Sequence, residues 1–187
     1  LLFSDEGTTQ LYLDVEADLA RSQSKLNIIP KEAGEKITQA AKVDIIDWKQ
    51  LEKRTSIVGY PILPLVEQLS EKVEGNFGQF CHWGATTQDI MDTADVLQIR
   101  KGLELLSKDL KSISDALEKI VEHHIKTPMA GRTHLQHALP ISFGYKASTW
   151  LSGIDRHQKR LEEIKERVFV VSFFGAAGTL ASLGEDN

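Results

Sequence analysis

Residues 82–89, HWGATTQD, place hydrogen-bonding side chains directly before a long helical pattern. Thr86, Thr87 and Gln88 supply hydroxyl and amide groups, and the two small residues before them let a ligand approach the backbone. The first N–H groups of a helix lack partners within the helix and attract carboxylates or phosphates. Two interpretations stay open: a helix cap made by Thr87 or Asp89, or one wall of an anion-binding site.

Residues 129–140, MAGRTHLQHALP, gather a guanidinium, a hydroxyl, two imidazoles and an amide within a few positions. Arg132 can pair with a carboxylate, and His134 supplies an imidazole, the side chain most often used as a general acid or base. Thr133 and Gln136 add hydrogen-bonding groups on either side. The alternative is a polar loop without chemistry.

Residues 174–184, FGAAGTLASLG, are rich in small side chains. Such a segment allows a backbone to approach a ligand, or allows helices of different subunits to pack closely. It is not a dinucleotide-binding fingerprint, because no strand precedes it and the glycine spacing is wrong.

Two long apolar stripes must position these segments. The first predicts a helix over about residues 88–125, roughly 55 Å long, and the second covers residues 143–168. A connection of about fifteen residues between them predicts antiparallel packing, as in a helical bundle. Neither stripe can be buried by the other alone, so further helices must come from additional sequence or from other chains.

Shorter helical patterns fill the first third of the chain. They begin near Ser4, Pro30, Trp48 and Leu65, with a helix-breaking region predicted over residues 55–64. No strand alternation is convincing. The sequence therefore predicts an all-α fold, with a small N-terminal helical domain in residues 1–90 and the first part of a long-helix bundle in residues 91–187.

Composition narrows the classes of function. The net charge of -5 offers no basic footprint for nucleic acid or anionic membranes, and no apolar run approaches the ~20 residues that span a bilayer. Cys81 is the single cysteine, which excludes an intrachain disulfide and favours a reducing, cytoplasmic compartment. No metal site or cofactor is expected. The chain starts without methionine and ends just after a glycine-rich stretch, so we expect a fragment that lacks a C-terminal part.

Three motifs in this order, HWGATTQDIMDTA, GRTHLQHALPISFG and GAAGTLASLG, resemble the fumarase/aspartase superfamily of homotetrameric lyases. The nearest resemblance is to the branch of 3-carboxy-cis,cis-muconate cycloisomerase and adenylosuccinate lyase, and it runs from residue 14 to the last glycine, Gly184. It implies removal of a proton alpha to a substrate carboxylate and loss of an amine or oxygen leaving group, or the reverse addition. It also implies a homotetramer whose active sites are shared by three subunits.

The resemblance implies a role for each candidate residue. His134 would be the general acid towards the leaving group, and Arg132 would contact substrate or hold its loop. The remaining substrate contacts would be His82, Thr86, Thr87, Gln88, Thr133 and Gln136. The superfamily's serine loop, with a Met-Pro-x-Lys-x-Asn pattern and the usual candidate base, is absent from the 187 residues. The chain alone would supply at most two of three walls and is expected to be inactive.

A few positions bear on the choice between cycloisomerase and adenylosuccinate lyase. Residues 60–66, YPILPLV, and the glycine-rich tail favour a cycloisomerase, whereas adenylosuccinate lyases usually carry a histidine near Gly59-Tyr60-Pro61. Many bacterial cycloisomerases carry leucine where His134 stands, which keeps adenylosuccinate lyase and other carboxylate lyases as alternatives. A noncatalytic helical assembly or interaction module that lost the base loop is a further alternative. A reading frame that continues into the serine loop would favour the enzyme.

Overall fold

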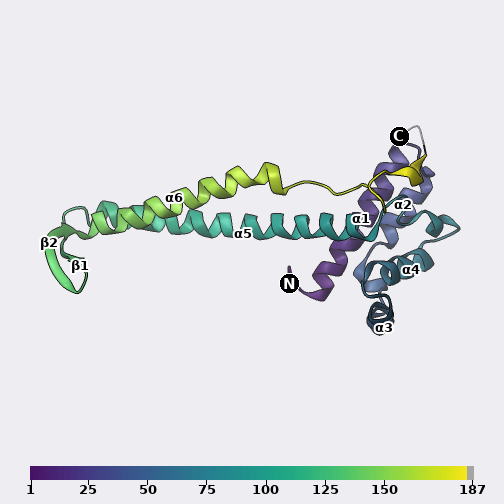
Figure 1. Cartoon of the computed structure of the whole chain (residues 1–187), viewed down its shortest axis with the longest axis horizontal. Helices are drawn as coiled ribbons and strands as arrows, with labels where there is room; N and C mark the ends of the chain where they lie inside the picture. Colours follow the sequence, from purple (N-terminus) through teal and green to yellow (C-terminus); the bar gives the residue numbers. More distant parts are fainter. Residues whose placement is uncertain (185–187) are drawn as a thin grey trace. The chain divides into compact units, whose positions relative to one another are not determined.

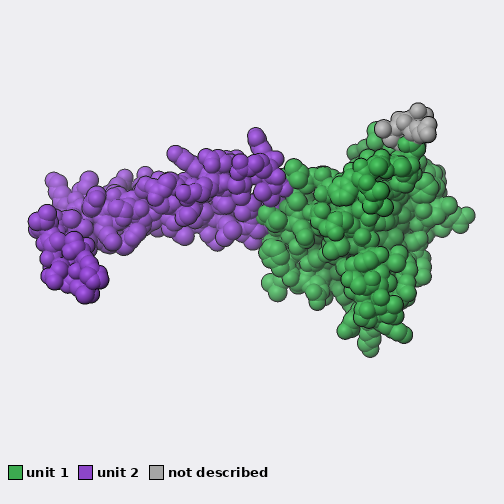
Figure 2. Space-filling model, viewed as in Figure 1, with its two compact units in different colours: residues 1–99, 169–187 green, residues 100–168 purple. Residues whose placement is uncertain are grey.

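The computed structural model describes residues 1–184 and divides the chain into two compact units. Unit 1 comprises residues 1–99 and 169–187, and unit 2 comprises residues 100–168 (Figure 2). The predicted domain division after residue 90 stays a prediction. No helix within residues 1–184 combines the length and apolar character needed to cross a membrane.

Unit 1 is built from short helices around the start of a long one (Figure 1). Its elements are α1 (Asp5–Lys25), α2 (Lys31–Ala40), η1 (Val43–Ile45), α3 (Trp48–Val58), α4 (Ile62–Lys72), η2 (Phe77–Phe80), the part of α5 (Thr87–His123) up to Ile99, and η3 (Ala181–Leu183). Ser4 begins α1 as predicted, because its hydroxyl accepts the N–H of Gly7 at 3.2 Å.

The predicted helix-breaking region is shorter than expected. Helix α3 runs to Val58 and α4 begins at Ile62, so residues 55–58 and 62–64 are helical. Gly59 ends α3 in the left-handed region, with φ of 93°. Pro61 and Pro64 stand before and within the first turn of α4, where a backbone N–H has no helical partner in any case.

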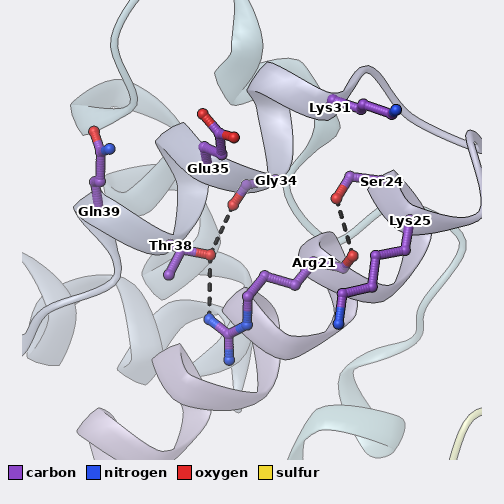
Figure 3. Close-up of a pocket in the computed structure, with 8 residues that line it drawn as sticks. All are labelled: Arg21, Ser24, Lys25, Lys31, Gly34, Glu35, Thr38 and Gln39. Atoms are coloured by element: carbon purple, nitrogen blue, oxygen red, sulfur yellow. Dashed lines mark hydrogen bonds between the residues drawn. The ribbon is translucent and has the colours of Figure 1, made fainter.

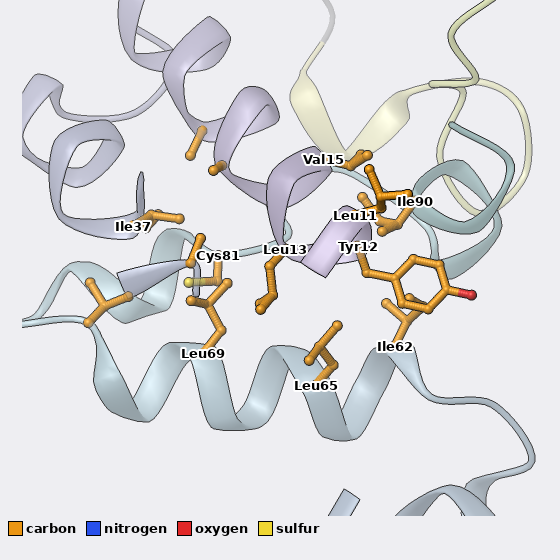
Figure 4. Packing of buried hydrophobic residues seen from close by; sticks show 14 of the residues in the cluster. Leu11, Tyr12, Leu13, Val15, Ile37, Ile62, Leu65, Leu69, Cys81 and Ile90 are labelled. Carbon is orange, nitrogen blue, oxygen red and sulfur yellow. The ribbon is translucent and has the colours of Figure 1, made fainter. Parts of the chain in front are cut away.

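The apolar core of unit 1 surrounds α1 (Figure 4). Helix α1 buries one face through Leu11 and Val15 and another through Leu13 and Ala17. Packed around it are fully or nearly fully buried side chains from α2, α4 and α5: Ile37, Ile62, Leu65, Leu69 and Ile90. This core fixes α1 against the start of α5, where two of the three sequence motifs meet.

Helices α1 and α2 approach closely at Gly34, which lines a surface hollow between them (Figure 3). A Cβ on Gly34 would lie inside contact distance of Ser24 Oγ, 2.8 Å from Ser24 Cβ and 3.0 Å from the backbone oxygen of Ala20. We expect Gly34→Ala to destabilise the protein by about 1–3 kcal/mol through overpacking, although alanine favours helices by up to about 1 kcal/mol.

Denaturant unfolding of the single and double variants tests this prediction. Adding Ser24→Gly to Gly34→Ala should recover part of the lost stability, because the nearest clashing atoms are removed. Additive losses in the double variant would show that the α1–α2 distance does not limit residue size at position 34.

Unit 2 is a helical hairpin that carries a small sheet. It contains the rest of α5, strands β1 (Pro128–Thr133) and β2 (Gln136–Ser142), and α6 (Phe143–Val168). Helices α5 and α6 lie side by side and antiparallel, as predicted, and Ser114 Oγ donates to Asp155 Oδ1 at 3.2 Å between them (Figure 1). The helical class of the chain is confirmed.

The connection between these helices is a β-hairpin, so the expectation of no strands was wrong here. Strands β1 and β2 pair antiparallel, with a shift of register at Gly131, between Ala130 and Arg132. Residues 132–140 are all exposed. A hairpin with both faces exposed has no alternation of apolar and polar residues, which explains why the pattern was missed.

The apolar stripes of unit 2 are only partly covered within the chain. Leu106 is 53% exposed, Ile113 45% and Trp150 48%. Two helices leave much of each stripe open to solvent, as the periodicity predicted.

Candidate functional site

The start of α5 is capped by Asp89. Its Oδ2 accepts the N–H of Thr86 at 3.0 Å, and its own N–H donates to the carbonyl of Thr86 at 3.1 Å. The bond from the Thr86 N–H to the Asp89 carboxylate is one half of a capping box, whereas the N–H of Asp89 goes to the backbone carbonyl of Thr86 and not to its hydroxyl. The cap therefore leaves the threonine hydroxyls free for another role.

Thr86 and Thr87 each present a side-chain hydroxyl at the start of α5. Both residues are half-buried, and neither hydroxyl has a hydrogen-bond partner among residues 1–184. Gln88 is exposed, and its Nε2 donates to Asp92 Oδ1 at 2.6 Å along the helix. The N–H groups of Thr87 and Gln88, the first two of α5, also lack helical partners, so the helix end offers N–H and O–H donors to an anion.

Asp89 also joins the first motif to the third. Its carboxylate is buried and accepts the N–H of Phe174 at 3.2 Å and that of Gly175 at 3.0 Å. One turn further, Thr93 Oγ1 accepts the N–H of Ser172 at 3.1 Å and donates to its carbonyl at 3.2 Å. The glycine-rich segment is thus held against the first turns of α5 within unit 1.

Two glycines allow this close approach. Gly84 has φ of 76°, and a Cβ there would lie 3.0 Å from Leu183 Cγ. Gly175 has φ of 72° and lies against the carbonyl of Gly84. The small residues of the third motif therefore serve packing inside the chain at this point, rather than only contacts with a ligand or another subunit.

His82 rests on a buried carboxylate that the sequence analysis missed. Its Nδ1 lies 2.6 Å from Oε1 of Glu16, whose side chain is fully buried. Glu16 projects from α1 between Leu13, Ala17 and Ala20, which are themselves buried. The sequence does carry a signal for this residue. Glu16 stands among apolar residues at helical spacing, and an acid that is buried on such a helix face requires a partner.

The same face of α1 also holds Trp83, the residue that follows His82 in the turn. Gln23 is buried two helical turns beyond Glu16, and its Nε2 donates to the carbonyl of Trp83 at 2.7 Å. His82 itself takes a left-handed backbone conformation, with φ of 58°. For a residue other than glycine this conformation costs about 1–2 kcal/mol, so it persists because Glu16 and Gln23 hold the turn.

The Cys81 thiol is expected to resist alkylation at neutral pH. Burial, and secondly the Glu16 carboxylate, raise the pKa of Cys81 from 9.0 to about 12. Because the pKa of the thiol is higher in the folded protein than in the unfolded chain, the protonated thiol favours the folded state. This contribution to stability is complete below pH 9 and is lost as the pH rises towards 12. Peptide mass spectrometry after iodoacetamide treatment should find little labelling of native protein at pH 8 and full labelling in denaturant. Equal labelling in both would contradict the burial of this thiol.

The second motif forms the tip of the hairpin in unit 2. Thr133 pairs with Gln136 and Arg132 with His137, while His134 occupies the turn. Leu135, beside it, is 88% exposed and has φ of 56°. The side chains of Arg132, Thr133, His134 and Gln136 are exposed and have no hydrogen-bond partner within the described part of the chain.

The predicted residues thus form two groups. His82, Thr86, Thr87 and Gln88 come together in unit 1, at the start of α5, and Arg132, Thr133, His134 and Gln136 come together in unit 2, at the hairpin tip. Among residues 1–184, no group of three or more histidine, cysteine or acidic side chains is arranged to hold a metal ion.

Comparison with known proteins gives a family match over nearly the whole chain. Residues 2–187 match the protein-family model described as Lyase. A crystal structure of fumarate lyase from Mesorhizobium sp. BNC1 is 57% identical, with a TM-score of 0.93, and the match covers 98% of this chain and 43% of that one.

Curated relatives carry several different names. Trans-aconitate decarboxylase 1 from Mycosarcoma maydis is 46% identical over 98% of this chain and 37% of its own length. The 3-carboxy-cis,cis-muconate cycloisomerase of Pseudomonas aeruginosa and the adenylosuccinate lyase of Methanocaldococcus jannaschii are 40% and 39% identical, over 98% of this chain and 41% and 40% of theirs. The chain spans about two fifths of the length of these relatives.

Proposed function

The chain belongs to the lyase family, within the fumarase/aspartase superfamily, and on that premise we propose that the whole protein is a lyase or cycloisomerase acting on a small polycarboxylate. The proposed chemistry is general acid–base elimination or addition. The observation that carries the proposal is the start of α5, where the hydroxyls of Thr86 and Thr87 have no hydrogen-bond partner among residues 1–184 and the N–H groups of Thr87 and Gln88 begin the helix. Such a helix end favours a carboxylate through both its donors and its dipole.

His134 is the proposed general acid. In an elimination, a base takes the proton from the carbon alpha to the carboxylate and the released electron pair forms the new double bond. The bond to the leaving group breaks, and His134 supplies the proton that neutralises it. The base belongs to a segment outside these residues. Thr133, Gln136 and Arg132 lie beside His134 at the hairpin tip and would contact the same substrate.

We further propose a cytoplasmic homotetramer in which several chains build each active site. The partly exposed stripes of α5 and α6 support an assembly of further helices. Leu135, next to His134, is 88% exposed and Leu139, further along β2, is 77% exposed, as expected of a hairpin that a neighbouring chain covers. The single, free cysteine fits a reducing compartment.

For the substrate, we favour a cycloisomerase-like reaction, with adenylosuccinate lyase as the alternative. The two curated relatives differ by one percentage point in identity, so similarity does not separate them. His134 favours lyase chemistry, whereas YPILPLV favours the cycloisomerase. The relative named for trans-aconitate adds another unsaturated polycarboxylate to the candidates.

A substrate panel on the full-length protein tests this proposal. The panel contains 3-carboxymuconate, adenylosuccinate, argininosuccinate, trans-aconitate, and fumarate with amines, followed by absorbance or product analysis. We expect turnover of one polycarboxylate, reduced in a Thr86→Val/Thr87→Val variant, which keeps residue size but removes both hydroxyls. A folded, assembled protein inactive on every member would contradict the proposed reaction and favour a noncatalytic helical module.

A further inference from the structure

We propose that Glu16 is a positioning residue for His82, holding the proton on Nδ1 so that Nε2 is the atom presented to the ligand. This inference rests on the proposed function, because it assumes that His82 belongs to the wall that binds the substrate. It adds a buried acid of α1 to a site otherwise made from a turn and a helix end.

The geometry of the pair supports a directed hydrogen bond. Nδ1 of His82 and Oε1 of Glu16 are 2.6 Å apart, the length of a charge-assisted bond. An ionised carboxylate can only accept, so Nδ1 must carry the hydrogen. Nε2 has no hydrogen-bond partner among residues 1–184, and the side chain is 20% exposed. Nε2 is then an acceptor in the neutral ring and a donor in the cation.

His82 is the only side chain that hydrogen-bonds to Glu16 among residues 1–184. Oε2 of Glu16 is buried without a partner among the described residues, so the carboxylate does not satisfy a helix end or a lysine. Holding the fold alone would be served by an apolar side chain of similar volume, which avoids an orphaned oxygen. A buried acid behind a histidine ring is instead the arrangement that sets the tautomer and orientation of an imidazole.

Gln23 offers a matched control on the same face of α1. Its amide holds the carbonyl of Trp83, next to His82, but does not contact the imidazole. Gln23→Leu therefore weakens the attachment of the turn without changing the partner of Nδ1. Any effect that Glu16 variants share with Gln23→Leu is structural, and any effect confined to Glu16 reports on the imidazole.

The tautomer of His82 gives a test that does not depend on activity. The full-length protein is labelled with ¹⁵N-histidine, and the His82 signals are identified by their loss in His82→Asn. At a pH where the ring is neutral, solid-state NMR should find the proton on Nδ1 in the unmodified protein. In Glu16→Leu, which removes the acceptor of the Nδ1 proton, the preference for Nδ1 should be lost, whereas Gln23→Leu should keep the proton on Nδ1. A proton on Nε2 in the unmodified protein would overturn the proposal.

Kinetics separate this inference from the proposed function. With a substrate identified, Glu16→Gln should lower kcat/KM by about 10–100-fold, the size of effect found for residues that orient metal-bound histidines, while Gln23→Leu changes it by less than about 3-fold. If His82→Asn impairs the enzyme but Glu16→Gln and Gln23→Leu behave alike, Glu16 is not a positioning residue and the proposed function still stands. If no polycarboxylate is bound or converted, the proposed function fails, and the tautomer alone decides whether Glu16 holds His82.

Discussion

Replacing His134 with asparagine is expected to lower kcat of the full-length protein by about 10²- to 10⁴-fold, the contribution of a general acid. Asparagine keeps the polarity of the side chain but cannot give a proton to the leaving group. His134 is exposed at the hairpin tip and has no partner within the described residues, so its loss leaves no buried group unsatisfied. The unfolding transition should therefore stay within about 0.5 kcal/mol of the unmodified protein.

His137, three residues after His134, provides the control. His137 is exposed on the same hairpin and pairs through its backbone with Arg132. We expect His137→Asn to change kcat by only a few-fold, so that a general disturbance of the hairpin can be told from loss of the acid. Equal losses in the two variants would mean that the hairpin as a whole, and not the imidazole of His134, matters for the reaction.

The second large effect concerns stability. We expect Asp89→Ala to lower the free energy of unfolding by about 3–5 kcal/mol, because three backbone N–H groups lose a buried, charged acceptor. The change removes the cap of α5 and the attachment of residues 174 and 175 together. Denaturant unfolding measures the loss, and hydrogen exchange should show the amides of Phe174 and Gly175 losing protection first.

Asp92, one turn along α5, provides the comparison. Its only hydrogen-bond partner among the described residues is the exposed amide of Gln88, so Asp92→Ala should cost less than about 1 kcal/mol. An Asp89→Ala protein as stable as Asp92→Ala would contradict the role given to the Asp89 carboxylate.

Much of the helical architecture could be predicted from the sequence, because apolar periodicity and helix caps depend on residues that are close together in the chain. The helix predicted over residues 143–168 is α6 without change, and the helix predicted over residues 88–125 is α5 at Thr87–His123. The family predicted from three motifs is confirmed by the match over residues 2–187. The hairpin was missed because a short strand pair exposed on both faces has no pattern to distinguish it from a polar loop.

The predicted site residues stay predictions, but their surroundings explain what sequence reasoning could and could not find. Thr86 and Thr87 could be found from the sequence, because hydroxyl side chains just before a helix are a local signal of a helix start. Glu16 and Gln23 act on a turn about 60 residues away in the chain, and only the packing of α1 brings them there. Long-range partners of this kind leave a trace in the sequence only as polar residues on an otherwise apolar helix face.

The attachment of the glycine-rich segment to Asp89 has a consequence for sequence change. The hydrogen bonds that Asp89 accepts from Phe174 and Gly175 come from their backbone N–H groups, and the Phe174 side chain is 41% exposed. Natural drift or directed evolution can therefore vary the side chain at position 174 while the attachment persists. Proline, which lacks the donor, is the replacement that this position should reject, so a library at residue 174 should recover most amino acids except that one.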